Sequence, residues 1–341
     1  MNSLRFKAIL GASLLALTAA LHPAPSAAQS DILLRLRSGS PLTDRFRVDS
    51  AGGIVAKGVL GIGIIPFTGA GERLMWHPNK AAFRAGSIGS AGTQWDDPNV
   101  GYYTWAGGYN TIALGLASFS MGYQSTALGS YATALGYTAN ADGTGAVAIG
   151  YRTTANADYS VAIGQRASTS GRAGAIVFSD GSTTDSTRAS ANNQFTVRAA
   201  GGTRLFTNAT MTAGVQLAAG GSSWAVISDR NRKESFLAAD GEDILARLRL
   251  VPVSTWRYLD EEDRATFHIG PMAQDWHRAF GFTRDDRTIN MSDIDGVNLA
   301  AIKALEARTA EVARLRAELD ATNQRLSDLE AIVRQLQERR P

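Results

Sequence analysis

The chain has 341 residues, a formal net charge of +3, 19% charged residues and no cysteine. A chain of this length has room for two or three domains. Its near-neutral charge gives no reason to expect a nucleic-acid partner, and the lack of cysteine excludes disulfide bonds and thiolate metal sites.

Residues 1–28 have the pattern of a secretory signal peptide. Arg5 and Lys7 precede an apolar run at 8–21, which is too short to span a bilayer comfortably, and small residues lead up to Ala28. Cleavage there removes two positive charges, so the net charge of +3 becomes +1. A buried N-terminal helix is the alternative interpretation. We predict an exported protein, secreted or at the cell surface, and no later apolar run suggests a transmembrane anchor.

Residues 29–100 are predicted to form a β-rich N-terminal module. The segment 46–58 (FRVDSAGGIVAKG) alternates in polarity around a Gly-Gly turn, as a β-hairpin does. Asp96 and Asp97 form a pair of acids that could hold a metal or a sugar. Because a Pro-Asn pair follows at once, we interpret these acids as turn-forming residues.

A seven-residue glycine period runs through residues 101–171. The period is too regular for a disordered Gly/Ser linker. It also argues against a coiled-coil heptad, because each helical glycine would cost about 1 kcal/mol. Ala157 stands where one glycine is expected. The glycines are Gly101, Gly108, Gly115, Gly122, Gly129, Gly136, Gly143, Gly150, Gly164 and Gly171.

Triplets such as Ala148-Ile149-Gly150 indicate short strands that end in a turn. Two units of this period would make one coil of a parallel β-solenoid, with each strand stacked on the next. The nonapeptide period of calcium-binding β-rolls does not fit, and Asp142 and Asp158 are the only aspartates in this segment. The hexapeptide period of other solenoids does not fit either.

These repeats, including SVAIG at residues 160–164, resemble the head of YadA-like trimeric adhesins over residues 101–178. The resemblance implies a left-handed parallel β-roll in each chain and three rolls packed side by side. A homotrimer also follows from the narrowness of the roll, because a strand alternates its side chains between two faces and one roll cannot bury both. The expected fold class is therefore mostly β.

Beyond the roll, residues 179–227 are predicted to form a β-rich connector, which includes NNQFTVRAAGGTRLFTN. Glycine becomes rare after about residue 225, and charged and helix-forming residues become common. Periodicity predicts a helix at 242–250, a strand within 251–260 and a short helix at 269–280.

This C-terminal part, which we expect to be an α/β domain, resembles the endosialidase-type intramolecular chaperone of phage tail spikes, and we place it at residues 228–304. The matching residues are Ser228-Asp229-Arg230 with Lys233, then HIGPMAQD at 268–275, then Asp-Gly-Val at 295–297 before a long helix. The resemblance implies a domain that trimerises the chain, guides its folding and then cuts itself off. It implies cleavage of the Ile227–Ser228 bond with Ser228 as nucleophile and Lys233 as its partner.

The Ser-Lys chemistry is coherent in itself. A serine hydroxyl is a weak nucleophile, and a lysine can take its proton when burial lowers the lysine pKa. Five residues place Ser228 and Lys233 about 140° apart on a helix, so a loop must bring them together. The family usually has an apolar residue where Arg232 stands, and this second cation either helps to neutralise the amine or keeps the loop hydrated. The alternative interpretation has Ser228 as a helix N-cap and Lys233 as a solvated charge.

Residues 305–341 are predicted to form a trimeric coiled coil with a 3.5-residue apolar seam. Two residues in the d row, Arg308 and Thr322, would weaken it. The a row holds Leu305, Val312, Leu319, Leu326 and Val333, and the d row holds Arg308, Leu315, Thr322, Leu329 and Leu336.

The sequence thus favours an exported trimeric fibre whose C-terminal chaperone acts at most as a single-turnover autoprotease. A glycan-directed hydrolase that uses the roll as a stalk and a non-cleaving structural fibre are the alternatives. A host-surface glycan or protein is a candidate partner, because tyrosines recur near the strand ends, and packing in the core or in an interface is the alternative role of these tyrosines. No cofactor or metal is expected, since the histidines lack metal-ligand spacing. These histidines are His22, His77, His268 and His277.

Overall fold

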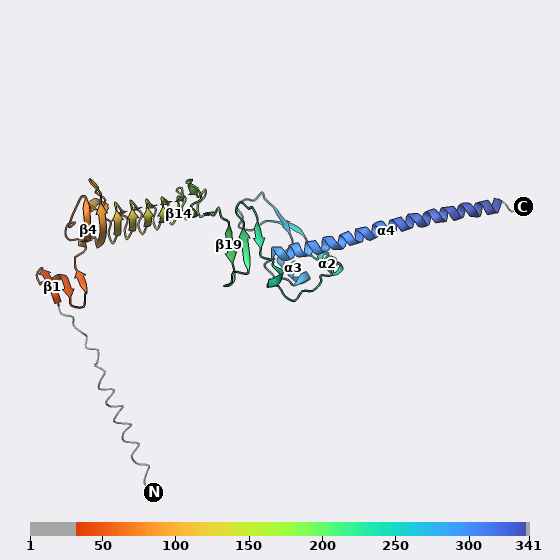
Figure 1. Cartoon of the computed structure of the whole chain (residues 1–341), viewed down its shortest axis with the longest axis horizontal. Coiled ribbons are helices and arrows are strands. Elements are labelled where there is room, and N and C mark those ends of the chain that lie inside the picture. The colour runs from red at the N-terminus through yellow and green to blue at the C-terminus, as the bar shows by residue number, and fades with distance from the viewer. Residues whose placement is uncertain (1–31, 339–341) are drawn as a thin grey trace, which may run out of the picture. The chain divides into compact units, whose positions relative to one another are not determined.

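The computed structural model of the chain describes residues 32–338, which fall into two compact units (Figure 1). The first unit ends at Thr203 and the second begins at Arg204, and each is described by itself. The predicted signal peptide, residues 1–28, lies outside the described residues. No helix among the described residues has the length and apolar character needed to cross a membrane.

A small antiparallel sheet opens the first unit, with strands β1 (Ile32–Ser38), β2 (Thr43–Asp49) and β3 (Ile54–Ala56). The hairpin predicted at 46–58 is confirmed by the pairing of β2 with β3. Its turn is closed by the Asp49 carboxylate, which accepts a hydrogen bond of 2.8 Å from the Gly53 amide.

The main body of the first unit is a β-solenoid made of a nine-stranded sheet and a six-stranded sheet. The nine-stranded sheet has the order β18-β16-β14-β12-β10-β8-β6-β5-β4, and the six-stranded sheet has the order β17-β15-β13-β11-β9-β7. The strands are β4 (Gly71–His77), β5 (Ala82–Ile88), β6 (Trp105–Tyr109), β7 (Ile112–Ala113), β8 (Phe119–Tyr123), β9 (Thr126–Ala127), β10 (Thr133–Tyr137), β11 (Asn140–Ala141), β12 (Val147–Tyr151), β13 (Thr154–Ala155), β14 (Val161–Gln165), β15 (Ala167–Ser168), β16 (Ile176–Ser179), β17 (Thr187–Arg188) and β18 (Phe195–Arg198).

The predicted coil of two seven-residue units is confirmed by the strand register. Thr133 of β10 pairs in parallel with Val147 of β12, and Val147 pairs with Val161 of β14, so equivalent positions in neighbouring coils are two such units apart. Only β4, at one edge of the nine-stranded sheet, runs antiparallel to its neighbour among the strands of this solenoid. This sheet extends beyond residues 101–178 at both ends.

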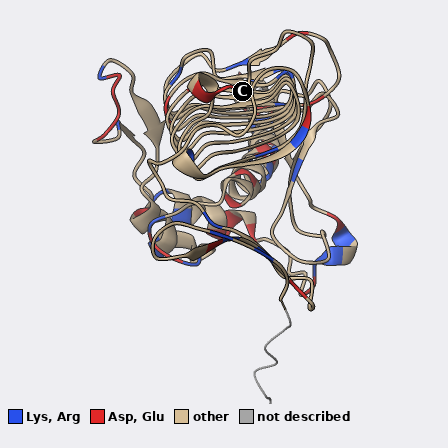
Figure 2. Cartoon of the chain, turned by 90° about the vertical axis from the view of Figure 1, so that its left-hand side faces the viewer, with Lys and Arg blue, Asp and Glu red and all other residues tan. Residues whose placement is uncertain are grey.

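The interior of the solenoid is packed mainly with alanine, because two sheets this close together leave room for little more than a methyl group. The coils also carry few charges, and Figure 2 shows the stacked coils almost wholly in the colour of uncharged residues. The buried cluster consists of Ala127, Ala132, Ala134, Ala139, Ala141, Ala146, Ala148, Ala155, Ala162, Ala167, Ala175, Val177 and Ala189.

Close backbone contact between coils explains the glycine period. A Cβ on Gly129 would lie 1.9 Å from the carbonyl oxygen of Gly143, and a Cβ on Gly143 would lie 2.1 Å from that of Ala157. Ala157 itself precedes a longer coil, since Val161 pairs with Ile176, one position beyond the regular step. We infer that the extra residue leaves room for the Ala157 methyl group.

Gly129→Ala is therefore expected to destabilise the solenoid strongly. Overpacking costs about 1–3 kcal/mol when side chains can move, and here the opposing atom is backbone, so we expect the upper end of that range or more. Ala157→Gly, in the same row, is the matched control and should cost only about 0.4–1 kcal/mol of chain entropy. Hydrogen exchange of the coils measured by mass spectrometry checks this, and equal exchange in the two variants would contradict it.

A buried arginine closes the N-terminal end of the solenoid. Arg84 of β5 is 0% exposed and pairs with Ala106 in the row that small residues fill in later coils. Its guanidinium donates to the carbonyl oxygens of Thr104 (3.2 Å) and Ala113 (3.0 Å) and to the Thr104 hydroxyl (2.9 Å). Burial lowers the pKa of Arg84 to about 10. Arg84 thus satisfies carbonyl groups at this end at the expense of its own hydration.

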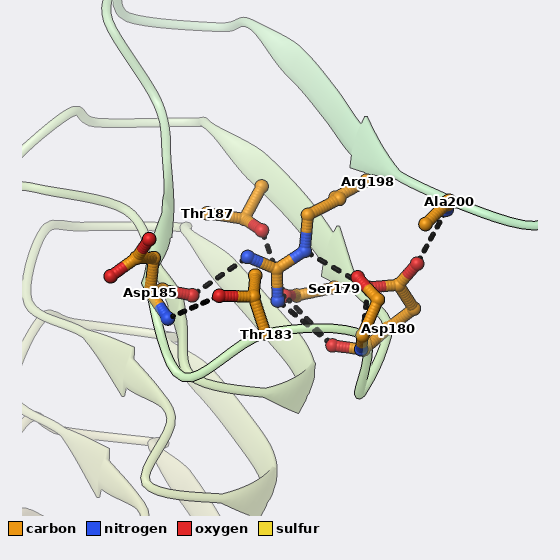
Figure 3. Close-up of polar contacts among 8 residues, drawn as sticks. Ser179, Asp180, Thr183, Asp185, Thr187, Arg198 and Ala200 are labelled. Carbon is orange, nitrogen blue, oxygen red and sulfur yellow. Dashed lines mark hydrogen bonds and ion pairs between the residues drawn. The ribbon is translucent and has the colours of Figure 1, made fainter. Parts of the chain in front are cut away.

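A second arginine organises the C-terminal end of the solenoid (Figure 3). The Arg198 guanidinium donates to the Asp180 carboxylate (2.9 Å), the Ser179 hydroxyl (2.8 Å) and the Asp185 carbonyl (2.7 Å). Asp180 also accepts a hydrogen bond from the Ala200 amide (2.5 Å), which is the main reason why its pKa lies below the usual range. The network fixes the loop after β16 and the chain leaving β18.

The second unit begins with a three-stranded sheet and continues into helices. The predicted helix and strand are confirmed as α2 and β22, whereas the helix expected from residue 269 begins at Ala273, because residues 268–270 pair with β22 as strand β23. The elements are β19 (Thr203–Phe206), β20 (Gly214–Leu217), β21 (Trp224–Val226), α2 (Gly241–Leu248), β22 (Ser254–Trp256), β23 (His268–Gly270), α3 (Ala273–Phe280) and α4 (Met291–Glu338).

Helices α2, α3 and α4 meet in a small apolar core formed by Ile244, Val251, Trp276, Phe280, Val297 and Ala301. Helix α2 also lies close to α4, since a Cβ on Gly241 would be 2.8 Å from that of Ala304. Arg308 of α4 forms an ion pair with Glu242 of α2. The side chain at this d position of the heptad pattern is thus engaged in an ion pair within its own chain.

Candidate functional site

The candidate cleavage site lies immediately after the edge strand β21. The Ile227 amide donates to the Gly214 carbonyl oxygen at 3.3 Å, which continues the pairing of β21 with β20 by one residue. Ile227 is half-buried, and Ser228 is exposed. The sheet therefore fixes the residue on the N-terminal side of the bond, while the serine lies in a loop.

A single 3-10 turn brings the serine and the lysine together. The turn, η3 (Arg230–Arg232), is capped by Asp229, whose carboxylate accepts a 2.9 Å hydrogen bond from the Asn231 amide. Lys233 follows with extended backbone, and its Nζ donates to the Ser228 Oγ at 2.6 Å. Two side chains five residues apart would not meet on one face of a helix. Here a loop and one tight turn bring them together, as expected.

The surroundings of this pair bear on both interpretations. The N-cap is Asp229, so the alternative that placed Ser228 in that position is wrong in this detail. Arg232 lies 3.6 Å from the Asp229 carboxylate, and Ser228 and Lys233 are both exposed in the single chain. A hydrated lysine amine is a hydrogen-bond donor, and it becomes a proton acceptor only when burial favours its neutral form.

The acid pair of the N-terminal module has a structural role. Asp96 accepts a 2.6 Å hydrogen bond from the Gly69 amide, and Asp97 begins the 3-10 turn η2 (Asp97–Asn99). Asp97 also accepts a 2.8 Å hydrogen bond from the buried ring of His77, which is the main cause of its lowered pKa. The prediction that these acids form a turn is confirmed.

The structure separates seven of the eight tyrosines at 101–171 into two sets that the sequence did not distinguish, and the eighth, Tyr102, has its ring centroid 6.4 Å from that of Tyr103. The first set is a continuous stack in which neighbouring ring centroids lie 5.0, 5.0 and 4.9 Å apart. It consists of Tyr109, Tyr123, Tyr137 and Tyr151. The second set is Tyr103, Tyr131 and Tyr159, which are 53%, 61% and 71% exposed. The second set recurs in every second coil, and this spacing was a readable signal in the sequence.

Comparison with known proteins finds two families. Residues 115–139 and 141–167 match the YadA head domain repeat, and residues 228–282 match the chaperone of endosialidase. Searches of curated proteins and of solved structures gave no match. The second match begins at Ser228 and includes Lys233. The chain therefore combines repeats similar to those of YadA heads with a segment similar to the chaperone of endosialidase.

Proposed function

We propose that the chain is the subunit of an exported homotrimeric fibre, at the cell surface or secreted, whose C-terminal domain drives assembly and then cleaves itself off. The observation that carries the proposal is the 2.6 Å contact between Lys233 and Ser228, at the start of the segment that matches the chaperone of endosialidase. The order of segments supports it: signal peptide at 1–28, N-terminal module at 29–100, left-handed roll at 101–178, connector at 179–227, chaperone at 228–304 and coiled coil at 305–341.

Apolar surface on the nine-stranded sheet supports association of the rolls. Side chains on its outer face include Trp105, Met121 and Phe178, which are 49%, 40% and 39% exposed. A sheet face of this kind is normally covered by another layer. In a trimer, each roll would cover this face of the next.

The coiled-coil seam supports association of the C-terminal domains. Leu319 and Leu326 are 58% and 55% exposed on α4, although leucine normally becomes buried in a stable helix. Three copies of α4 would bury the a and d rows against one another. Because Arg308 is held by Glu242, we place the start of the continuous seam after Arg308.

The proposed cleavage is an acyl shift followed by hydrolysis. The Ser228 oxygen bonds to the carbonyl carbon of Ile227, and the C–N bond between the two residues breaks. The hydroxyl proton passes through the Lys233 amine to the nitrogen that leaves. Water then opens the ester, which yields a carboxylate on Ile227 and frees the Ser228 hydroxyl. Assembly would start the reaction if neighbouring chains bury Lys233, because burial favours the neutral amine that can accept the proton.

Removal of the C-terminal domain tests the proposal. The mature chain, residues 29–341, should refold from denaturant to a trimer, whereas residues 29–227 should give little soluble trimer, because aligning three parallel rolls is slow without a registration device. Light scattering measures the mass of each product. A monomeric full-length protein, or equal trimer yield from the truncated chain, would contradict the proposal.

A further inference from the structure

Three tyrosines in the turns of the solenoid have a left-handed backbone conformation, which residues with a side chain disfavour. They are Tyr103, Tyr131 and Tyr159, here called the corner tyrosines, and the turn position that they share is called the corner. Their φ values are 61°, 61° and 56°. The left-handed region is disfavoured for a non-glycine residue, because Cβ comes too close to the following carbonyl oxygen. Ala117 and Gly145 occupy the same corner in the intervening coils, with φ values of 53° and 64°. Small residues thus adopt the same left-handed conformation at this position, so the turn does not require a tyrosine.

The corner tyrosines are held firmly although their rings are exposed. The Tyr131 amide donates to the Leu116 carbonyl oxygen at 2.7 Å, and the Tyr159 amide donates to that of Thr144 at 2.8 Å. One edge of the Tyr159 ring lies over Gly145, with its Cδ1 3.2 Å from the position that a Cβ would occupy there. Small residues and tyrosines therefore alternate from coil to coil at this position. The small residue leaves space for the tyrosine ring and keeps successive tyrosine rings apart.

The stacked tyrosines show how rings are arranged when every coil carries one. Tyr123 and Tyr137 are nearly parallel, at 3° between their planes, so their faces cover one another. The corner tyrosines are two coils apart, which is about 9–10 Å at the usual strand spacing. The corner tyrosines therefore do not stack on one another, although the Tyr102 ring centroid lies 6.4 Å from that of Tyr103. Ser130, Thr144 and Asp158, which carry hydroxyl or carboxylate groups, precede the corner in successive coils.

We propose that the corner tyrosines form a binding strip for an extended, neutral, β-1,4-linked glycan. In such a chain every second sugar presents the same apolar C–H face to one side, and that face can lie on an aromatic ring while hydroxyl groups bond to polar side chains. The surroundings favour a neutral ligand, since residues 101–171 carry two aspartates and two arginines, at 142, 158, 152 and 166. The proposal rests on the exported, surface-directed function proposed above.

A protein ligand or a second copy of the chain fits this strip less well. A stable protein interface buries about 800 Å² on each partner around a continuous apolar centre. The corner tyrosines are instead separated by Ala117 and Gly145, and Ser130 and Asp158 directly precede Tyr131 and Tyr159. Rings that recur at a regular distance suit a ligand that is itself a regular chain.

Calorimetric titration of the full-length protein with β-1,4-linked hexasaccharides of N-acetylglucosamine and of glucose tests the proposal. We expect binding of at least one of them, and weaker binding of an α-1,6-linked glucose hexamer, whose chain is more flexible. Tyr131→Ala should weaken binding about fivefold to tenfold. The variant should fold normally, because Ala117 already occupies the equivalent corner at φ 53°.

Two controls make the test specific. Tyr137→Ala in the stack should change the affinity less than about twofold, since that ring has no free face. Ala117→Tyr should weaken binding, because rings in three consecutive coils would stack and cover their faces. If the glycan instead adhered nonspecifically to aromatic surface, the added ring would strengthen binding. Failure of both β-1,4 hexamers to bind would overturn the inference and leave trimerisation and cleavage unaffected. Loss of the trimer in Tyr131→Ala would overturn it as well, because the strip would then be a contact between chains.

Discussion

Ser228→Ala is expected to leave every chain whole while the trimer still forms. The alanine keeps the backbone and removes the only atom that the proposed mechanism uses to attack the Ile227 carbonyl. Wild-type protein should instead yield a fibre ending at Ile227 and a released fragment that runs from Ser228 to Pro341. Intact mass spectrometry distinguishes the two results. Cleavage should be first order and independent of protein concentration once trimers exist, because nucleophile and target bond belong to one chain.

Variants around Ser228 separate its chemistry from its place in the loop. Lys233→Met should also abolish cleavage, because it leaves the serine protonated. Ser223→Ala, a change at an exposed serine before β21, is the matched control and should cleave like the wild type. Arg232→Leu should accelerate cleavage if Arg232 hydrates the loop and slow it if that cation helps to neutralise Lys233. Wild-type chains that stay intact for days after trimerisation would identify a non-cleaving fibre.

Replacing both Leu319 and Leu326 with aspartate is expected to abolish the trimer. Each leucine contributes about 2 kcal/mol when fully buried, and the substitution would in addition bring carboxylates of three chains together in an apolar seam. Light scattering should then report a monomer. The same variant should not cleave, if neighbouring chains supply the burial that Lys233 requires.

The matched control puts the same charge on the opposite side of α4. Ala317→Asp combined with Ala331→Asp adds two carboxylates at positions outside the a and d rows and should leave the trimer intact. A double leucine variant that remains trimeric would show that the seam of α4 does not hold the chains together. Cleavage in a monomeric variant would show that Lys233 acts without assembly.

The repeat was readable from the sequence because one physical constraint recurs in every coil. At Gly129 and Gly143 the next coil lies so close that a methyl group would overlap a carbonyl oxygen, and this constraint imposes a fixed glycine spacing. The heptads of α4 are readable for a similar reason, since a helix repeats its orientation at a fixed interval. Ala157 looked like a lapse in the pattern, and the register shift after Val161 accounts for it.

Contacts between residues far apart in the sequence were not predictable in the same way. Nothing in the heptad pattern indicates that Arg308 pairs with Glu242, 66 residues earlier. The buried Arg84 reads as an ordinary charged residue in a strand, because its partners are carbonyl groups that every sequence has. At the candidate site, the resemblance implied the pairing of Ser228 and Lys233, and their spacing required a loop. The N-cap is Asp229 and not Ser228, and the sequence did not decide between them because both residue types suit this position.

The regular register of the coils also has a consequence for how such a solenoid can change in length during evolution. Arg84 and Arg198 close the two ends of the solenoid with contacts that do not involve the coils between β8 and β14. A duplication or deletion of one whole coil in that stretch preserves every pairing and shifts the ends by about 4.7–4.9 Å. A change of one residue inside a strand would turn interior alanines outward, whereas the extra residue between β15 and β16 lies in a turn and leaves Ala162 paired with Val177 in the interior. The length of the solenoid therefore varies in whole coils, and selection on this length acts through steps of that size.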